Sequence, residues 1–306
     1  MTILILGGAG MIGQRLARAL PGHDLILADV VAAPPMPGAE VLTLNLSAPG
    51  AAAKLIARKP EVIFHLAAIV SGEAEADFEK GYRDNLDAAH ALFEAIRLTP
   101  NYRPRVIFAS SIAVFGPPFP PAIQDDLALT PRTSYGTQKA ITELLLADYA
   151  RKGFLDGVAM RLPTICIRPG KANKAASGFF SNILREPLAG LPAILPVPDT
   201  VRHWFASPRT AVGFFQHAMS LDLSRLEGRI ALNMPGLSAT VAEEIEALRR
   251  VAGQKAVDLI RHEPDAVIQR IVASWPENFD PVRAKALGFK AETSFDQIIT
   301  AHLEEN

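Results

Sequence analysis

The chain has 306 residues, of which 49% are hydrophobic, so it can bury a large core and form one or two domains. Its formal net charge of −1 gives no support to a polyanion-binding surface. The single cysteine, Cys166, excludes an internal disulfide, and without a signal peptide or an apolar run of roughly 18 residues we expect a soluble, cytoplasmic globular protein.

Short apolar runs alternate with helical patterns along the first half of the chain. The expected strands are almost continuously apolar, as a sheet covered on both faces requires. They span residues 3–6, 25–28, 41–44, 62–66, 106–109 and 158–162. The expected helices lie between them, at 11–20, 51–58, 74–97 and 134–152. This alternation predicts an α/β fold of Rossmann type with a doubly wound parallel sheet.

Prolines and glycines interrupt the pattern between residues 163 and 198, so regular elements there are expected to be short. Helices are expected again at 208–219, after Thr240 and at 263–275, and Glu243 completes a capping box with Thr240. We therefore expect a NAD-binding Rossmann domain at 1–165 and a smaller mixed α/β substrate lobe at 166–306. Parts of this lobe, around 205–235, are expected to return to the Rossmann domain.

A glycine motif joins the first expected strand to the first helix. Gly7, Gly10 and Gly13 allow a tight turn and bring backbone N–H groups to a pyrophosphate at the helix N-terminus. Asp29 ends the second strand roughly 20 residues later, where a carboxylate can accept both hydroxyls of an adenosine ribose. Since residues 30–33 carry no Arg or Lys for a 2′-phosphate, the pattern favours NAD over NADP. The alternatives are an ordinary strand–helix turn and a strand-end aspartate.

Tyr135 and Lys139 are spaced by one helical turn, so both side chains lie on one helix face. An ammonium beside a phenol favours the phenolate and lowers the tyrosine pKa from about 10 toward neutrality. Such a tyrosine can act as a general base toward an alcohol or a general acid toward a carbonyl. The pair alone is also typical of a helix surface, and its weight comes from the glycine motif and the upstream serines Ser110 and Ser111.

These pieces together resemble the extended short-chain dehydrogenase/reductase family, also described as NAD-dependent epimerases/dehydratases. The matching segments are GGAGMIG, HLAA, YRDNLDAAHALFEAI, SSIAVFG, PRTSYGTQK, RLPTICIRPG, RHWFASPRTA and the tail KALGF…TSFDQII. The resemblance covers essentially the whole chain. It implies an NAD-dependent oxidoreductase.

The resemblance implies a role for each matching residue. Ser111 would hydrogen-bond the reacting oxygen, Tyr135 would transfer the proton, and Lys139 would hold the nicotinamide ribose. Asn85 would support the active-site architecture, and Asn45 stands near adenine, where the family more often has aspartate. The expected cofactor-binding residues are Gly7, Gly10, Met11, Ile12, Gly13, Asp29, Asn45, Leu46, Leu66, Ala67, Ala68, Asn85, Tyr135, Lys139, Leu162 and Pro163.

Other residues with reactive side chains are expected to be structural. For Ser110 we expect a strand-end hydroxyl that is satisfied by the backbone. We expect His65 to be a packed histidine and Cys166 to be a small core residue. The remaining histidines show no metal-ligand spacing, so no metal is implied.

The shared motifs leave the outcome of the reaction open. Hydride transfer from a carbinol carbon can end in release of a ketone, or in re-reduction from the other face, as in nucleotide-sugar epimerases. Nucleotide-sugar members usually carry acidic residues where this chain has His203 and Arg209, which argues against such a substrate. A third reading, a non-catalytic dinucleotide sensor, is disfavoured by the intact Tyr135–Lys139 pair.

Residues 161–211 are similar to the branch of the family that oxidises the four-carbon sugar acid D-erythronate at its 2-hydroxyl with NAD. Ser71, Ser111 and Asn173 are the candidate donors to such a substrate. Arg202 is the candidate carboxylate clamp, because a guanidinium matches a carboxylate in bidentate geometry. A structural salt bridge is the alternative role for Arg202.

A homodimer is also implied, because in this family the helices at 85–97 and 135–152 often pair across a dimer. Their apolar residues are Leu92, Phe93, Ile96, Leu144, Leu145 and Tyr149. Some of this surface must also cover the sheet. The expected partners are a small sugar acid and a second copy of the chain, with no nucleic acid and no membrane.

Overall fold

The computed structural model describes residues 1–170 and 176–305, which form two compact units. The first unit comprises Met1–Val114, Pro131–Leu162 and Val212–Leu232. The second comprises Phe115–Thr130, Pro163–Ala211 and Asn233–Asn306.

The sequence did not indicate that Phe115–Thr130 joins the second unit. The segment belongs there because Ile123 pairs with the chain around Phe279. The Ile123 N–H donates to the Asn278 carbonyl at 2.9 Å, and the Asp280 N–H donates to the Ile123 carbonyl at 2.8 Å.

A seven-stranded sheet forms the first unit and confirms the predicted Rossmann-type fold. The order is β10-β6-β5-β4-β1-β2-β3, and the pairs from β6 to β3 are parallel. The seventh strand, β10, was not predicted. The strands are β1 Thr2–Leu6, β2 Asp24–Asp29, β3 Ala39–Thr43, β4 Val62–His65, β5 Arg105–Ser111, β6 Asp156–Leu162 and β10 Ala231–Asn233.

The strand order reverses between β1 and β4. From β1 the chain runs outward through β2 to β3, and it then crosses to β4 on the other side of β1. In open α/β sheets the ligand lies at the carboxyl ends of the strands at such a reversal. The topology therefore places the site where the glycine loop follows β1 and residues 66–70 follow β4.

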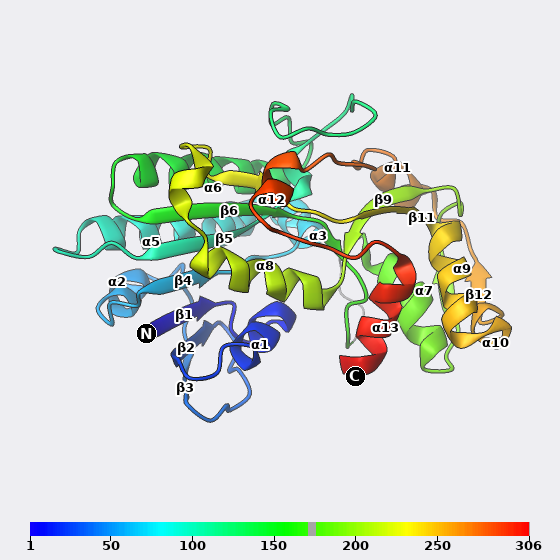
Figure 1. The fold of residues 1–306 in the computed structure, drawn as a ribbon, viewed down its shortest axis with the longest axis horizontal. Helices are drawn as coiled ribbons and strands as arrows, with labels where there is room; N and C mark the ends of the chain where they lie inside the picture. The colour runs from blue at the N-terminus through cyan, green and yellow to red at the C-terminus, as the bar shows by residue number, and fades with distance from the viewer. Residues whose placement is uncertain (171–175, 306) are drawn as a thin grey trace. The chain divides into compact units, whose positions relative to one another are not determined.

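Helices cover both faces of this sheet, as a doubly wound fold requires (Figure 1). Helix α5 packs between α2 and α6. On the other face, α8 lies beside α1, where Gln216 Nε2 donates to the Ala19 carbonyl at 2.8 Å. The helices are α1 Met11–Arg18, α2 Ala51–Ile56, α5 Ala88–Arg97, α6 Ser134–Arg151 and α8 Pro208–Ser220, with short 3₁₀ turns at Ile112–Val114 and Leu223–Leu226.

The single helix expected at 74–97 is wrong, because the chain there is divided into four parts. A break falls at Asp77, whose backbone leaves the helical region (φ −129°) and whose side chain accepts from the Lys80 N–H at 3.0 Å. Asp77 thereby caps a new helix. The parts are α3 Ser71–Ala76, α4 Phe78–Tyr82, a π-helical turn at Arg83–Asp87, and α5.

The second unit contains two small sheets and six helices among its described residues. One sheet has the order β11-β9-β7, and the other pairs β12 with β8. The strands are β7 Thr164–Ile165, β8 Ala193–Leu195, β9 Arg202–Ala206, β11 Leu237–Thr240 and β12 Ile260–His262. The helices are α7 Gly178–Leu188, α9 Val241–Ala252, α10 Gln254–Val257, α11 Ala266–Val272, α12 Val282–Ala286 and α13 Phe295–Glu305.

Two helix starts in this unit follow from capping side chains. The predicted capping box is present, with Thr240 and Glu243 each satisfying the other's backbone N–H at the start of α9. Helix α11 is shorter than the expected 263–275, since Asp265 caps it by accepting from the Val267 and Ile268 N–H groups.

Within the described ranges, no helix combines the length and apolar character that a membrane crossing needs.

Candidate active site

The glycine loop is packed so tightly that side chains are excluded from it. A Cβ on Gly13 would lie 2.2 Å from the Gly7 carbonyl oxygen, and one on Gly7 would lie 2.8 Å from the Ala67 nitrogen. Gly7 also has a positive φ of 84°. The turn brings Gly10, the N-cap of α1, back to Gly7, whose carbonyl accepts from the Gly10 N–H at 3.0 Å. The pyrophosphate expected at this helix start stays a prediction.

The helix start contributes the donors of this cradle. Met11 and Ile12, both half-buried, are the first two residues of α1. Their N–H groups belong to the turn that has no intrahelical acceptors, so they are available to an anion. Buried Gln14 supports the loop from below, because its Nε2 donates to the Gly8 carbonyl at 2.6 Å.

Asp29 ends β2 directly beside the glycine loop. Its carboxylate accepts from the Ala9 N–H at 3.0 Å and from the Val30 N–H at 2.7 Å. Each oxygen therefore takes one backbone bond and keeps lone pairs for a ribose hydroxyl. This arrangement fits a dinucleotide whose adenosine ribose lies over the loop.

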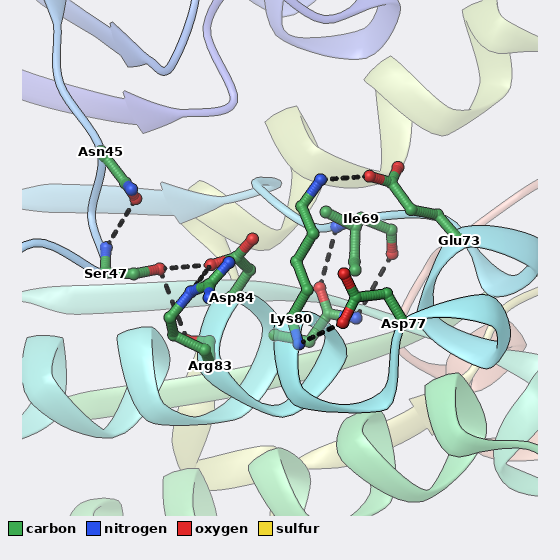
Figure 2. Close-up of polar contacts among 9 residues, drawn as sticks. Asn45, Ser47, Ile69, Glu73, Asp77, Lys80, Arg83 and Asp84 are labelled. Atoms are coloured by element: carbon green, nitrogen blue, oxygen red, sulfur yellow. Dashed lines mark hydrogen bonds and ion pairs between the residues drawn. The ribbon is translucent and has the colours of Figure 1, made fainter.

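The segment that follows β3 is held by a polar group of its own and by Asp84 of the π-helical turn (Figure 2). Asn45 Oδ1 accepts from the Ser47 N–H at 2.9 Å, and the Ser47 hydroxyl donates to Asp84 Oδ1 at 2.8 Å. Asn45 is exposed and Leu46 is buried. The expected adenine contacts of these two residues stay predictions.

Asn85 fastens the segment after β4 to the helix layer. Its Oδ1 accepts from the Ile69 N–H at 2.9 Å and its Nδ2 donates to the Ile69 carbonyl at 3.3 Å. The same Nδ2 donates to Gln138 Oε1 at 2.8 Å, and Gln138 lies between Tyr135 and Lys139 on α6. Asn85 therefore joins the segment after β4 to α6, and its role in the active site stays a prediction.

The backbone that Asn85 holds includes three expected cofactor residues. Leu66 and Ala67 are half-buried, Ala68 is exposed, and Gly7 packs on the Ala67 backbone. Ser71 follows as the first residue of α3. All four stand at the same carboxyl edge of the sheet as the glycine loop.

Helix α6 begins against the turn that carries Ser111. Thr133 caps the helix by accepting from the Gly136 N–H at 3.0 Å. A Cβ on Gly136 would lie 2.1 Å from the Ala113 carbonyl oxygen, so only glycine permits this approach. Tyr135, the residue before Gly136, therefore lies next to the backbone that follows Ser111.

Lys139 is buried beside the tyrosine rather than solvated on the helix surface. Its side chain is 2% exposed, and its Nζ donates to the Ala109 carbonyl at 2.9 Å. The Nζ lies 4.6 Å from the centroid of the Phe108 ring and 5.5 Å from that of the Tyr135 ring. Burial lowers the pKa of Lys139 to about 7, while Glu143 opposes this shift.

Ser111 and Ser110 have different surroundings. The Ser111 hydroxyl is half-buried and accepts from the Ala113 N–H at 3.1 Å, which leaves its proton available to a ligand. The Ser110 hydroxyl donates to the Glu143 carboxylate. Ser110 is therefore structural, as expected, but the predicted backbone partner is wrong. A buried carboxylate takes that place.

Glu143 and Arg161 form a buried ion pair that the sequence analysis did not identify. Arg161 Nη2 lies 2.8 Å from Glu143 Oε2, and Arg161 Nε lies 3.1 Å from each carboxylate oxygen. The signal was present in the sequence, because an arginine within an otherwise apolar strand requires a buried counter-charge.

His65 occupies the end of β4 as a packed side chain. Its ring meets Phe108 edge-on at 5.5 Å, and neither ring nitrogen has a hydrogen-bond partner among the described residues. Burial, together with the nearby Lys139, lowers the pKa of His65 to about 3. The histidine is therefore neutral at physiological pH.

The other expected substrate and cofactor residues are distributed between the units. Leu162 ends β6 in the first unit, and Pro163 is a buried residue of the second. Asn173 lies outside the described residues. Arg202 donates to Ser238 and forms an ion pair with Glu243 at 3.3 Å, which supports its structural role over the clamp.

Three further residues of the second unit have structural partners. His203 bonds Thr164 at 2.6 Å and the Pro276 carbonyl at 3.0 Å, and burial lowers its pKa to about 3. Arg209 pairs with Glu304 and Glu305. Cys166 is buried, as expected, and burial raises the pKa of its thiol.

A glycine-rich helix start and a half-buried tyrosine beside a buried lysine, at one sheet edge, define a nicotinamide-dependent enzyme. The chain belongs to the NAD dependent epimerase/dehydratase family, whose model matches residues 3–204. NAD is therefore its cofactor, and the tight glycine loop and Asp29 fit that molecule.

Similar proteins match over the full length. The chain is 48% identical to a D-erythronate dehydrogenase of Cupriavidus necator, with 100% of this chain and 98% of the relative covered. It is 45% identical to a D-erythronate dehydrogenase of Haemophilus influenzae, with 99% of each covered. A solved structure described as the nucleoside-diphosphate-sugar epimerase from Agrobacterium tumefaciens is 56% identical, with a TM-score of 0.97 over 100% of this chain and 94% of that one.

Proposed function

We propose that this enzyme oxidises D-erythronate at its 2-hydroxyl, with NAD as the hydride acceptor and a 2-oxo acid as the product. The chemistry is supported by Lys139, which is buried beneath the Tyr135 ring and next to the turn that carries Ser111. The substrate is supported by full-length relatives that carry the name D-erythronate dehydrogenase.

The residues at the sheet edge have distinct tasks in this reaction. Tyr135, as the phenolate, accepts the proton of the substrate hydroxyl. Ser111 donates a hydrogen bond to the same oxygen, and its position is fixed by the Ala113 N–H. Lys139 in its ammonium form stabilises the phenolate. When bound, NAD supplies the nicotinamide carbon that takes the hydride from the substrate carbon.

The direct test is a panel of four- to six-carbon aldonates with NAD, followed by NADH absorbance. Turnover is expected with D-erythronate at a higher kcat/KM than with longer acids. Absence of NADH formation with every acid would overturn the proposal. A matched assay with NADP is expected to give a lower kcat/KM, because Asp29 repels a 2′-phosphate.

A nucleotide-sugar epimerase is the second candidate, and the description of the 56% identical solved structure favours it. The two functions differ in their net chemistry. An epimerase binds a UDP- or dTDP-sugar tightly and accumulates no NADH, whereas the proposed dehydrogenase releases one NADH for each alcohol oxidised. Calorimetric titration with UDP-glucose and dTDP-glucose separates them.

Assembly and location extend the proposal. Leu144 on α6 is 67% exposed, which supports a homodimer contact, whereas Leu92, Phe93 and Ile96 are buried within the unit. Gel filtration of wild type and Leu144→Glu tests the dimer, since the variant is expected to elute as a monomer. Location in the cytoplasm stays a prediction from the single buried cysteine.

A further inference from the structure

The carboxylate of Glu143 is joined to both layers that carry the catalytic residues. Glu143 lies on α6, one helical turn after Lys139, and is 3% exposed. It accepts from the Ser110 hydroxyl on β5 and from the Arg161 guanidinium on β6. Since Ser110 and Arg161 are register partners on neighbouring strands, one carboxylate connects α6 to two strand ends.

Glu143 thus holds the end of β5, which carries Ser111, the serine of the proposed reaction. Ser110 stands between Ala109, whose carbonyl accepts from Lys139, and Ser111, whose hydroxyl faces the reacting oxygen in the proposed mechanism. A slip of α6 along β5 would therefore separate Tyr135 and Lys139 from both partners. The bonds to Glu143 oppose this slip.

The same carboxylate supplies charge in a site that otherwise disfavours an ammonium. Lys139 is packed against the Phe108 ring and faces His65 on β4, Tyr135 and Glu143 on its own helix, with Arg161 on β6 beyond the carboxylate. His65 is neutral above its low pKa of about 3, so it adds no positive charge at physiological pH. Glu143 is the anionic group of this set and raises the pKa of Lys139 against the effect of burial.

We propose that Glu143 is a positioning residue that keeps Lys139 in its ammonium form and keeps the Ala109–Ser110–Ser111 strand end in register with Tyr135. Its kinetic consequence rests on the proposed function. Its electrostatic consequence does not, because it can be measured without a substrate.

The primary test is the titration of Lys139 by NMR in protein carrying ¹³C- and ¹⁵N-labelled lysine, with Lys139→Met assigning the signal. The wild-type midpoint is expected near pH 7. In Glu143→Gln it is expected about one unit lower. Glu143→Asp and Ser110→Ala, which both keep the carboxylate, are expected to stay closer to wild type than Glu143→Gln. An unchanged midpoint in folded Glu143→Gln would overturn the proposal.

A double variant covers the case in which Glu143→Gln does not fold, because that change alone leaves the buried Arg161 charge without its anion. Glu143→Gln with Arg161→Met removes both buried charges, and its midpoint is expected below that of wild type but above that of Glu143→Gln, because the Arg161 charge that disfavours the ammonium is lost as well. A wild-type midpoint in the folded double variant would contradict the electrostatic role.

The pH profile of kcat/KM for D-erythronate is the second readout. The alkaline limb, where Lys139 loses its proton, is expected to move about one unit lower in Glu143→Gln. A purely structural role would instead lower the rate equally at every pH, and that result would refute the proposal. If wild type shows no turnover, the proposed function fails while the Lys139 titration still decides the role of Glu143.

Discussion

The tightest contact of the glycine loop makes a quantitative prediction about NAD binding. In Gly13→Ala, the new Cβ would stand 2.2 Å from the Gly7 carbonyl oxygen, whereas ordinary contact begins at 3.4 Å. The helix and the loop must therefore separate by about 1 Å. Overpacking of this kind costs about 1–3 kcal/mol, which exceeds the gain of about 1 kcal/mol from replacing a helical glycine.

This displacement moves the backbone N–H groups away from the pyrophosphate. We expect the Kd of NAD, measured by isothermal titration calorimetry, to rise about 10- to 100-fold, which corresponds to about 1.4–2.8 kcal/mol. Gly213→Ala is the matched control, because Gly213 lies within helix α8 and no heavy atom stands within 4 Å of its added Cβ. The control is expected to keep the wild-type Kd. A Kd within about twofold of wild type in Gly13→Ala would refute the reasoning.

Three further predictions concern the proton-accepting Tyr135, a supporting amide and a buried acid. Tyr135→Phe is expected to lower kcat about 10²- to 10⁴-fold with little change in the Kd of NAD. The control is Tyr102→Phe, because the Tyr102 hydroxyl donates to the Pro60 carbonyl. Retained turnover in Tyr135→Phe would contradict its role. Asn85→Leu removes the hydrogen bonds to Ile69 and Gln138. It is expected to lower the free energy of unfolding in urea by about 2–4 kcal/mol and to weaken NAD binding. An unchanged Kd of NAD would show that the segment after β4 is held by other contacts. Glu244 is fully buried, its carboxylate has no hydrogen-bond partner among the described residues, and burial raises its pKa well above the usual value. The unfolded chain loses this proton at lower pH than the folded chain, so the free energy of unfolding falls as pH rises above about 5. The stabilisation by Glu244→Met, measured by urea unfolding, is therefore expected to grow by up to about 1.4 kcal/mol per pH unit. A stability difference between Glu244→Met and wild type that stays constant with pH would refute the argument.

Local features of the sequence were sufficient for much of the fold and the cofactor site. Continuous apolar runs predicted six strands of the large sheet, and the glycine spacing predicted the turn at Gly7–Gly13, because both depend on neighbouring residues. Helix boundaries were less predictable. The break at Asp77 depends on a competition between capping and helix continuation within one apolar pattern.

Contacts between distant segments could not be predicted in this way. Nothing near Ile123 indicates that it pairs with residues around Phe279. The sequence left Arg202 with two possible roles, and the structure supports the structural one by placing Glu243 beside it. The pairing of Ile123 and the role of Arg202 both depend on which distant residues come into contact after the chain has folded.

By itself, the sequence determined the class of fold, the dinucleotide cofactor and the Tyr135–Lys139 pair, because each is expressed in periodicity or spacing along one segment. Only the tertiary structure decided how that pair is surrounded. Lys139 is buried against Phe108, and Glu143 is held between Ser110 and Arg161. The physical reason is that burial and charge compensation depend on side chains from separate strands and a helix, whose proximity no local pattern encodes.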